Sequence, residues 1–298
     1  MIDLRKTRAG LQRHLAALTL AIGERSVRRP EKLRETAEYL RSAYGGIPLN
    51  AWWEPYDFQG MTVHNVVASL APASPPRAHY VVGSHYDSVA GTVGADDNAS
   101  AVAVQLELAR ELAAPSNRKR LAAAVTFVSF ALEEPPAYGT RYMGSRVYAS
   151  RARKAGTPID GMICLEMVGY TCRTPGCQGY PFPLMFLGYP EAGDFIGIVG
   201  NFRSRPFAGR LLDSFRKNRR LPSIGLTVPF DGWLMPTVRL SDHASFWREG
   251  YPAVMVTDTA FYRNPHYHLP SDTMETLDVD FMARLVESLV GFFLSPIP

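Results

Sequence analysis

The sequence has few cysteines, no long hydrophobic stretch and little net charge. Its 298 residues include 3 cysteines, too few for a disulfide framework. No apolar run reaches the roughly 18 residues of a transmembrane helix, so we expect no membrane partner. The 32 basic and 28 acidic residues give a net charge of +4, too small and too scattered to indicate nucleic-acid binding. No repeat, low-complexity tract or linker divides the chain, which favours one domain over residues 1–298.

The N-terminal residues argue against a secretory leader. The positions where a signal peptide has its apolar middle hold Asp3, Arg5, Lys6, Arg8 and Arg13. We therefore expect a cytoplasmic protein, unless a leader was removed before this numbering begins. A reducing cytosol favours free thiols at Cys172 and Cys177, although these two flank a short turn and could close a small loop. Cys164 lies in an apolar run, where a buried core residue is expected.

The hydrophobic pattern predicts an α/β fold. Four apolar runs that do not alternate with polar residues are typical of strands buried on both faces, and they lie at 80–82, 125–130, 162–165 and 253–256. Helical spacing occurs at about 3–23, 31–44, 99–112, 141–153, 206–219 and 279–293. Two short strand-like pieces, 52–56 and 62–70, precede the first buried run. The alternation predicts a single domain with a mixed, mostly parallel central sheet flanked by helices on both faces.

Chemically active side chains follow three of the four buried runs. The residues just beyond these runs are His85 with Asp87, then Glu133 with Glu134, and then Glu166. In open α/β sheets, ligands bind beyond the carboxyl ends of the strands, so these side chains are expected at one site. The loop that holds Asp97 and the late stretch that holds His268 are expected to join them.

Carboxylates gathered in this way would repel one another, and a divalent metal resolves that conflict. Imidazole and carboxylate without thiolate suit a catalytic zinc. The candidate ligands are too many for one catalytic zinc and suit two metals that share a bridging carboxylate: His85, Asp97, Glu134, Glu166 and His268. Glu133 remains as an uncoordinated carboxylate, the residue type that a general base requires.

Each of these features alone has an ordinary explanation. A His-x-Asp after a strand is commonly a loop salt bridge or a hydrogen-bonded pair, and residues 96–98 would serve as an N-cap cluster. Glu133 and Glu134 would be solvated surface, and His268 would be a surface residue of a polar loop. Their joint placement, each beside a strand end, favours the metal site over these separate explanations.

The motifs that hold these residues resemble those of the co-catalytic zinc aminopeptidases of clan MH. This family includes bacterial leucyl aminopeptidases and, more distantly, glutamate carboxypeptidase and glutaminyl cyclase. The resemblance covers roughly residues 65–276, and its five motifs are the runs 83–88, 94–100, 133–134, 166–169 and 267–273. It implies a zinc-exopeptidase fold of the phosphorylase/hydrolase-like type, with the N-terminal helices at about 3–44 packed on the sheet.

The resemblance also implies a role for each matching residue. His85 and Glu166 would bind one Zn²⁺, Glu134 and His268 would bind the other, and Asp97 would bridge them. The same comparison makes Asp87 the carboxylate that orients the first histidine, Glu133 the general base, and Tyr267 a hydrogen-bond donor to the oxyanion. Family members carry a cis peptide after the bridging aspartate, here between residues 97 and 98.

The sequence departs from the family pattern at two positions. Glu166 stands where many members have aspartate, which keeps a carboxylate but could displace or weaken the zinc that it binds. Ala101 replaces a common glycine, and we expect little effect.

The implied activity is that of an aminopeptidase, which hydrolyses the first peptide bond of a substrate with a free α-amine. A glutaminyl cyclase-like enzyme with one zinc is an alternative, as is a carboxypeptidase or dipeptidase. The last two would need a cation for a substrate carboxylate, for which the candidates are Arg141, Arg239 and Arg263. A non-catalytic binding module is a further alternative, but all five ligand positions hold metal-binding residue types.

The sequence does not determine which substrate side chain is preferred, and it says nothing about the oligomeric state. Several residues are candidates for an apolar pocket, although core packing is the commoner role for such residues: Met143, Phe230, Trp233, Phe246 and Phe261. The pair Asp242-His243 resembles a recurring family motif, and we interpret its histidine as structural rather than as a metal ligand.

Overall fold

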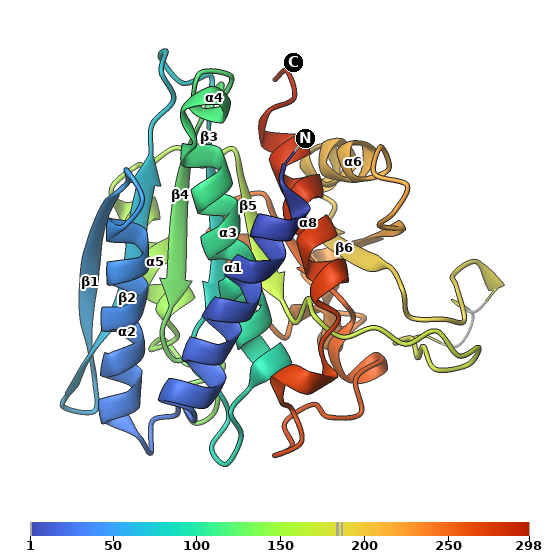
Figure 1. The fold of residues 1–298 in the computed structure, drawn as a ribbon, viewed down its shortest axis with the longest axis horizontal. Helices are drawn as coiled ribbons and strands as arrows, with labels where there is room; N and C mark the ends of the chain where they lie inside the picture. Colours follow the sequence, from blue (N-terminus) through green and yellow to red (C-terminus); the bar gives the residue numbers. More distant parts are fainter. Residues whose placement is uncertain (1, 183–184, 186, 298) are drawn as a thin grey trace.

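The computed structural model describes residues 2–182, 185 and 187–297, and its centre is an eight-stranded sheet (Figure 1). The strands lie in the order β1-β2-β4-β3-β5-β8-β6-β7. Their bounds are β1 Asn50–Phe58, β2 Met61–Leu70, β3 Ala78–His85, β4 Ala123–Phe130, β5 Gly161–Glu166, β6 Ile196–Asn201, β7 Ser223–Val228 and β8 Ala253–Thr257.

The centre of the sheet is parallel and its flanks are antiparallel. β3 pairs in parallel with β4 and with β5, and β5 pairs in parallel with β8. On one side β1, β2 and β4 pair antiparallel, and on the other side β6 runs antiparallel to β8, with β7 parallel to β6. The carboxyl ends of four adjacent strands therefore meet at one edge of the sheet, where the sequence predicts the site.

Helices cover both faces of the sheet. α1 (Leu4–Ala16), α3 (Ala101–Ala113) and α8 (Val279–Phe293) pack against one another over one face, together with α2 (Pro30–Gly45) and α6 (Arg205–Phe215) (Figure 1). The other face carries α5 (Gly144–Lys154) and α7 (His243–Arg248). The remaining short helices are α4 Pro115–Arg118, η1 Ala17–Ile22, η2 Ala95–Ser100, η4 Phe230–Gly232, η5 Pro236–Arg239, η6 Ala260–Tyr262 and η7 Met274–Thr276.

Burial on both faces explains the continuous apolar runs. Val81 and Val82 are neighbours in β3, and both are completely buried. Val82 belongs to the core beneath α3 and α8, whereas Val81 belongs to the core beneath α5 and α7. Because successive strand residues point to opposite faces, both must be apolar when helices cover both faces. The predicted fold class is thereby confirmed.

Two strands, β6 and β7, and the helix α7 were not predicted from the sequence, nor were the short helices α4, η4, η5, η6 and η7. β6 contains Gly197 and Gly200, and β7 contains Gly225. Glycine has a low strand propensity and breaks up an apolar run, so both strands lack the pattern by which the others are recognised. α7 has only six residues, too few to show helical periodicity.

Cys172 and Cys177 form a disulfide, which corrects the expectation of free thiols. The turn between them places their Cα atoms 6.3 Å apart, within the range that a disulfide can span. Cys164 is free and completely buried, as predicted. Among the described residues, no helix combines the length and the apolar character needed to cross a lipid bilayer.

Candidate metal centre

The structure brings the predicted metal ligands together at the carboxyl edge of the parallel strands. His85 is the last residue of β3 and Glu166 the last residue of β5, while Glu134 follows β4. Asp97 lies in η2, before α3, and His268 lies in the loop beyond η6. The first four of these residues are buried, and the side chain of His268 is 32% exposed.

Asp97 lies between the two histidines. Its Oδ1 is 3.4 Å from His85 Nε2, and its Oδ2 is 3.1 Å from His268 Nε2. His85 Nε2 also lies 3.4 Å from Glu166 Oε2, and His268 Nε2 lies 3.6 Å from Glu134 Oε2. Each histidine therefore has one carboxylate of its own and shares Asp97 with the other histidine.

Two of the groups that these residues form have the composition of a zinc site. Each group offers three ligand atoms within 4.8 Å of one another, and Asp97 belongs to both: His85, Asp97 and Glu166; and Asp97, Glu134 and His268. One imidazole and two carboxylates per group suit zinc. A third group of the same kind combines His85 with Glu133 and Glu134, so Glu133 lies within ligand distance as well.

Asp87 joins two strand ends of the site. Its Oδ1 accepts a hydrogen bond from the backbone N–H of Glu133, and its Oδ2 accepts one from the N–H of Glu134, both at 3.0 Å. The Nδ1 of His85 lies 3.4 Å from Asp87 Oδ1 and 3.2 Å from the Asp87 carbonyl oxygen. Asp87 therefore positions the two glutamates and the first histidine, a wider role than the sequence suggested.

The backbone around Asp97 is held by groups that sequence reasoning left without a role. Asp272 accepts hydrogen bonds from the N–H of Asp96 (2.8 Å) and of Asp97 (3.1 Å). The Asn98 side chain donates to the Leu165 carbonyl (3.1 Å), which ties this segment to β5. The peptide between Asp97 and Asn98 is cis, as the resemblance implied. Asp272 lies in the motif at residues 267–273, so the sequence contained a signal for it.

Two further polar contacts were missed. The hydroxyl of Ser241 donates to Glu166 Oε2 (2.5 Å), which fixes one carboxylate of the site. Arg25 is completely buried and donates to the backbone carbonyls of Tyr86, Val93 and Gly94, in the loop between β3 and η2. Ser241 directly precedes the pair Asp242-His243, which was a signal in the sequence, whereas nothing in the sequence pointed to Arg25.

The electrostatics of the cluster favour a bound cation. Burial raises the pKa of the Glu133 carboxyl well above its ordinary value, and the charge of Glu134 adds to this effect. Burial and the charge of Asp97 raise the pKa of Glu134 to about 8. Burial lowers the pKa of His268, but Asp97 and Glu134 outweigh it and raise that pKa to about 10. The Oε1 of Glu134 is buried with no hydrogen-bond partner among the described residues, as expected of a ligand atom.

Tyr267 lies beside this cluster. Its ring stacks on the His268 ring with the centroids 3.7 Å apart. Burial and the charges of Asp97 and Glu134 raise the pKa of its hydroxyl, which therefore stays protonated and can donate a hydrogen bond.

Several other candidates from the sequence lie elsewhere. Arg263 is buried and donates to Gln178 and to the carbonyls of Tyr170 and Phe195, so it supports the structure rather than offering a cation to a substrate. His243 is also structural, because its Nε2 lies 2.8 Å from the Val238 carbonyl and burial lowers its pKa to about 4.

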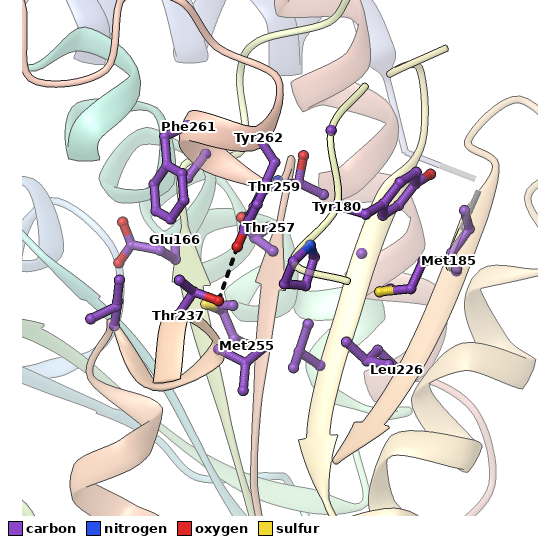
Figure 2. A pocket seen from close by; sticks show the side chains of 18 of the residues that line it. Glu166, Tyr180, Met185, Leu226, Thr237, Met255, Thr257, Thr259, Phe261 and Tyr262 are labelled. Carbon is purple, nitrogen blue, oxygen red and sulfur yellow. Dashed lines mark hydrogen bonds between the residues drawn. The ribbon is translucent and has the colours of Figure 1, made fainter. Parts of the chain in front are cut away.

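Of the five predicted pocket residues, only Phe261 lines the cavity that opens beside Glu166. Met143 and Phe246 are buried away from it, whereas Phe230 and Trp233 are exposed. The cavity has a volume of about 100 Å³. Most of its lining is apolar and comes from β6, β7, β8, η6 and the residues before β6 (Figure 2). The Glu166 carboxylate lies at one end of it (Figure 2).

Comparison with known sequences places this site in a peptidase family. The model of Peptidase family M28 matches residues 65–182, which hold four of the five candidate ligands. The chain is 35% identical over 288 residues to the uncharacterized protein YfbL of Escherichia coli (strain K12), a match that covers 94% of the chain and 85% of that protein. It is 27% identical over 239 residues to a probable leucine aminopeptidase 1 of Trichophyton verrucosum, with 77% of the chain and 57% of that protein covered. The chain thus spans little more than half the length of this fungal relative.

Solved structures of similar fold include both an aminopeptidase and a cyclase. The Legionella pneumophila LapA aminopeptidase matches with a TM-score of 0.69 at 20% identity, over 97% of this chain and 72% of LapA. The Tannerella forsythia glutaminyl cyclase matches with a TM-score of 0.68 at 17% identity, over 99% of each chain. At such identities the likeness shows the fold alone.

Proposed function

The chain belongs to peptidase family M28, and we propose that it is an aminopeptidase that uses two zinc ions. The observation that carries this proposal is the position of Asp97, which belongs to two groups of three ligands at once. His85 and Glu166 would complete one zinc site, and Glu134 and His268 the other. Two zinc ions would polarise the scissile carbonyl and lower the pKa of the attacking water towards about 7.

The residues of the chain supply the proton transfers. Glu133 lies among the ligands and is the carboxylate left over when each zinc has its own set. It accepts a proton from the attacking water and returns it to the leaving amine, as a general base and then a general acid. Burial raises the pKa of this carboxyl, which favours its acceptance of a proton from the water. Tyr267 keeps its proton and donates a hydrogen bond to the oxyanion of the substrate.

The acidic character of the site determines which end of a peptide binds. Glu133 and Glu166 are the carboxylates that would receive the free α-amine of the substrate, and burial raises the pKa of both. A carboxypeptidase would instead need a cation beside the metals. Arg263 is engaged with backbone carbonyls and Gln178. The other two candidates are exposed residues: Arg141 and Arg239. The apolar cavity beside Glu166 would receive the first side chain of the substrate.

Metal analysis combined with a substrate panel tests the proposal. We expect about two zinc ions per chain, hydrolysis of aminoacyl anilides with a free amine, no hydrolysis of N-acetylated anilides, and loss of activity with chelator. Peptides that begin with glutamine test the cyclase alternative. One zinc per chain together with release of pyroglutamyl peptide would replace the aminopeptidase proposal with a cyclase.

A further inference from the structure

The apolar cavity beside the metal centre has two ends. Glu166 and Phe261 lie at the end nearer to the candidate ligands, and Met185 and Leu226 lie at the other end (Figure 2). Met185 comes from the segment before β6, and Leu226 belongs to β7. The far end is therefore built from elements that contribute none of the candidate metal ligands.

A hydrogen bond separates these two ends. The Tyr262 hydroxyl donates to Thr237 Oγ1 at 3.0 Å, and the bonded pair lies between the two ends in Figure 2. Tyr262 ends η6 and Thr237 lies in η5, so the bond joins two separate loops across the cavity. The backbone of Tyr262 is held by other bonds, because its carbonyl accepts from the Gly179 N–H (2.6 Å) and its N–H donates to the Thr259 carbonyl (3.1 Å). The side-chain bond is thus the contact that can open without unfolding the loop.

The size of the cavity makes this bond important for selectivity. A dry apolar cavity of about 150 Å³ accommodates a benzene ring. The whole cavity here measures about 100 Å³, and the Tyr262 side chain lies between its two ends in Figure 2. The space beside Glu166 is therefore smaller than a cavity known to hold a benzene ring, which favours an aliphatic side chain over an aromatic one.

We propose that the hydrogen bond between Tyr262 and Thr237 limits how deep a substrate side chain can enter. The enzyme then selects peptides with an aliphatic N-terminal side chain, and it admits an aromatic side chain only when this bond opens. Neither residue is a candidate metal ligand. Both would therefore act on the choice of substrate side chain and not on metal binding. The inference rests on the proposed aminopeptidase function, so its test includes a measurement of binding that needs no turnover.

The binding test uses amino alcohols, which carry the amine and the side chain but no scissile bond. Calorimetry on the zinc-loaded protein compares leucinol, phenylalaninol and alaninol. We expect leucinol to bind about tenfold more tightly than phenylalaninol. Thr237→Val removes the hydroxyl that accepts the bond at nearly constant volume, and Thr237→Ser retains it. The Thr237→Val variant should narrow the preference for leucinol over phenylalaninol severalfold, and the Thr237→Ser variant should preserve it. Neither variant should change the affinity for alaninol.

Tyr262→Ala is the second variant, because it removes the ring and joins the two ends of the cavity. It should bind phenylalaninol at least as tightly as leucinol. The inference is overturned if the wild type binds both alcohols equally, or if Thr237→Val and Tyr262→Ala leave the ratio unchanged.

Turnover separates this inference from the proposed function. The ratio of kcat/KM for leucine and phenylalanine anilides should move in the same direction as the binding ratio. If the binding ratio shifts but no anilide is hydrolysed, the aminopeptidase proposal fails and the depth limit stands. If the anilides are hydrolysed but the ratio of kcat/KM for leucine and phenylalanine anilides is the same in all variants, the proposed depth limit fails and the aminopeptidase proposal stands.

Discussion

The guanidinium of Arg25 donates a hydrogen bond to the backbone carbonyl of Gly94 at 3.0 Å, three residues before the candidate bridging ligand Asp97. The same side chain donates to the carbonyls of Tyr86 (2.7 Å) and Val93 (2.6 Å). Arg25 therefore fixes both ends of the loop that runs from β3 to η2. Burial lowers its pKa to about 10, so it remains charged at neutral pH.

Replacement of Arg25 by methionine should weaken zinc binding as well as stability. The substitution removes the guanidinium that donates to the carbonyls of Tyr86 and Val93, whereas Gly94 keeps the bond from the Ala99 N–H. We expect a loss of about 3 kcal/mol in the free energy of unfolding. Zinc affinity should fall about tenfold or more, as for other residues that support metal ligands. The loss of a nearby positive charge would by itself strengthen zinc binding. A weaker zinc affinity in this variant would therefore show that the loop has lost its ordered shape.

A chelator competition titration and urea unfolding measure these two effects. Arg28→Met is the matched control, because Arg28 is an exposed arginine three positions further along. Unchanged zinc affinity in the Arg25 variant would mean that the loop keeps its shape without the guanidinium.

Glu133→Gln should abolish turnover and leave the metal in place. The amide has the shape of the carboxylate but cannot accept a proton at neutral pH, and we expect kcat to fall by about 10²–10⁴. Glu133 belongs to neither of the two groups that share Asp97, so the zinc content should stay near that of the wild type. The measurements are metal analysis and steady-state kinetics with an aminoacyl anilide.

Glu134→Gln is the matched control for the general base. Its side chain belongs to a group with Asp97 and His268, so we expect this variant to lose zinc together with activity. Full activity in the Glu133 variant, or zinc loss equal to that of the Glu134 variant, would assign Glu133 a different role.

The clustering of the candidate ligands could be predicted from the sequence, because the chemistry of such a site needs particular residue types at strand ends. His85 and Glu166 directly follow apolar strand residues, and parallel pairing brings them together. Arg25 was out of reach, since its partners are backbone carbonyls, which leave no trace in the amino-acid pattern. The bond from Tyr262 to Thr237 was equally hidden, because it joins two loops far apart in sequence and both residues have ordinary roles in loops.

Asp242 should make the stability of the metal-free protein depend on pH. Burial raises the pKa of its carboxyl from 3.8 to about 7, and the charges of Glu166 and Asp87 add to this effect. A raised pKa means that the stabilising contribution is complete below pH 3.8 and is lost as the pH rises through about 7. The difference of about three pKa units corresponds to roughly 4 kcal/mol.

Asp242→Asn removes this buried charge. The amount by which its Tm exceeds that of the wild type should grow by several degrees between about pH 4 and about pH 8.5. Asp213→Asn, at a side chain that is 77% exposed, should track the wild type at both values. Thermal unfolding of zinc-free samples provides the comparison, and a difference in Tm that is the same at both pH values would contradict the assigned titration.

Removal of zinc should destabilise the folded protein in two distinguishable steps. A ligand at a hundredfold excess over its Kd stabilises the state that it binds by about 2.7 kcal/mol, so two sites together contribute about 5 kcal/mol. His268→Ala removes a ligand from the group that holds Glu134 and leaves His85, Asp97 and Glu166 complete. We therefore expect chelator to lower the Tm of this variant by about half as much as that of the wild type. A double variant with His85→Ala as well should show no chelator effect, which controls for action of the chelator on the protein itself.

Zinc titration of the metal-free wild type should saturate at two equivalents and that of His268→Ala at about one. Saturation at one equivalent in both proteins would show that Asp97 does not bridge two ions.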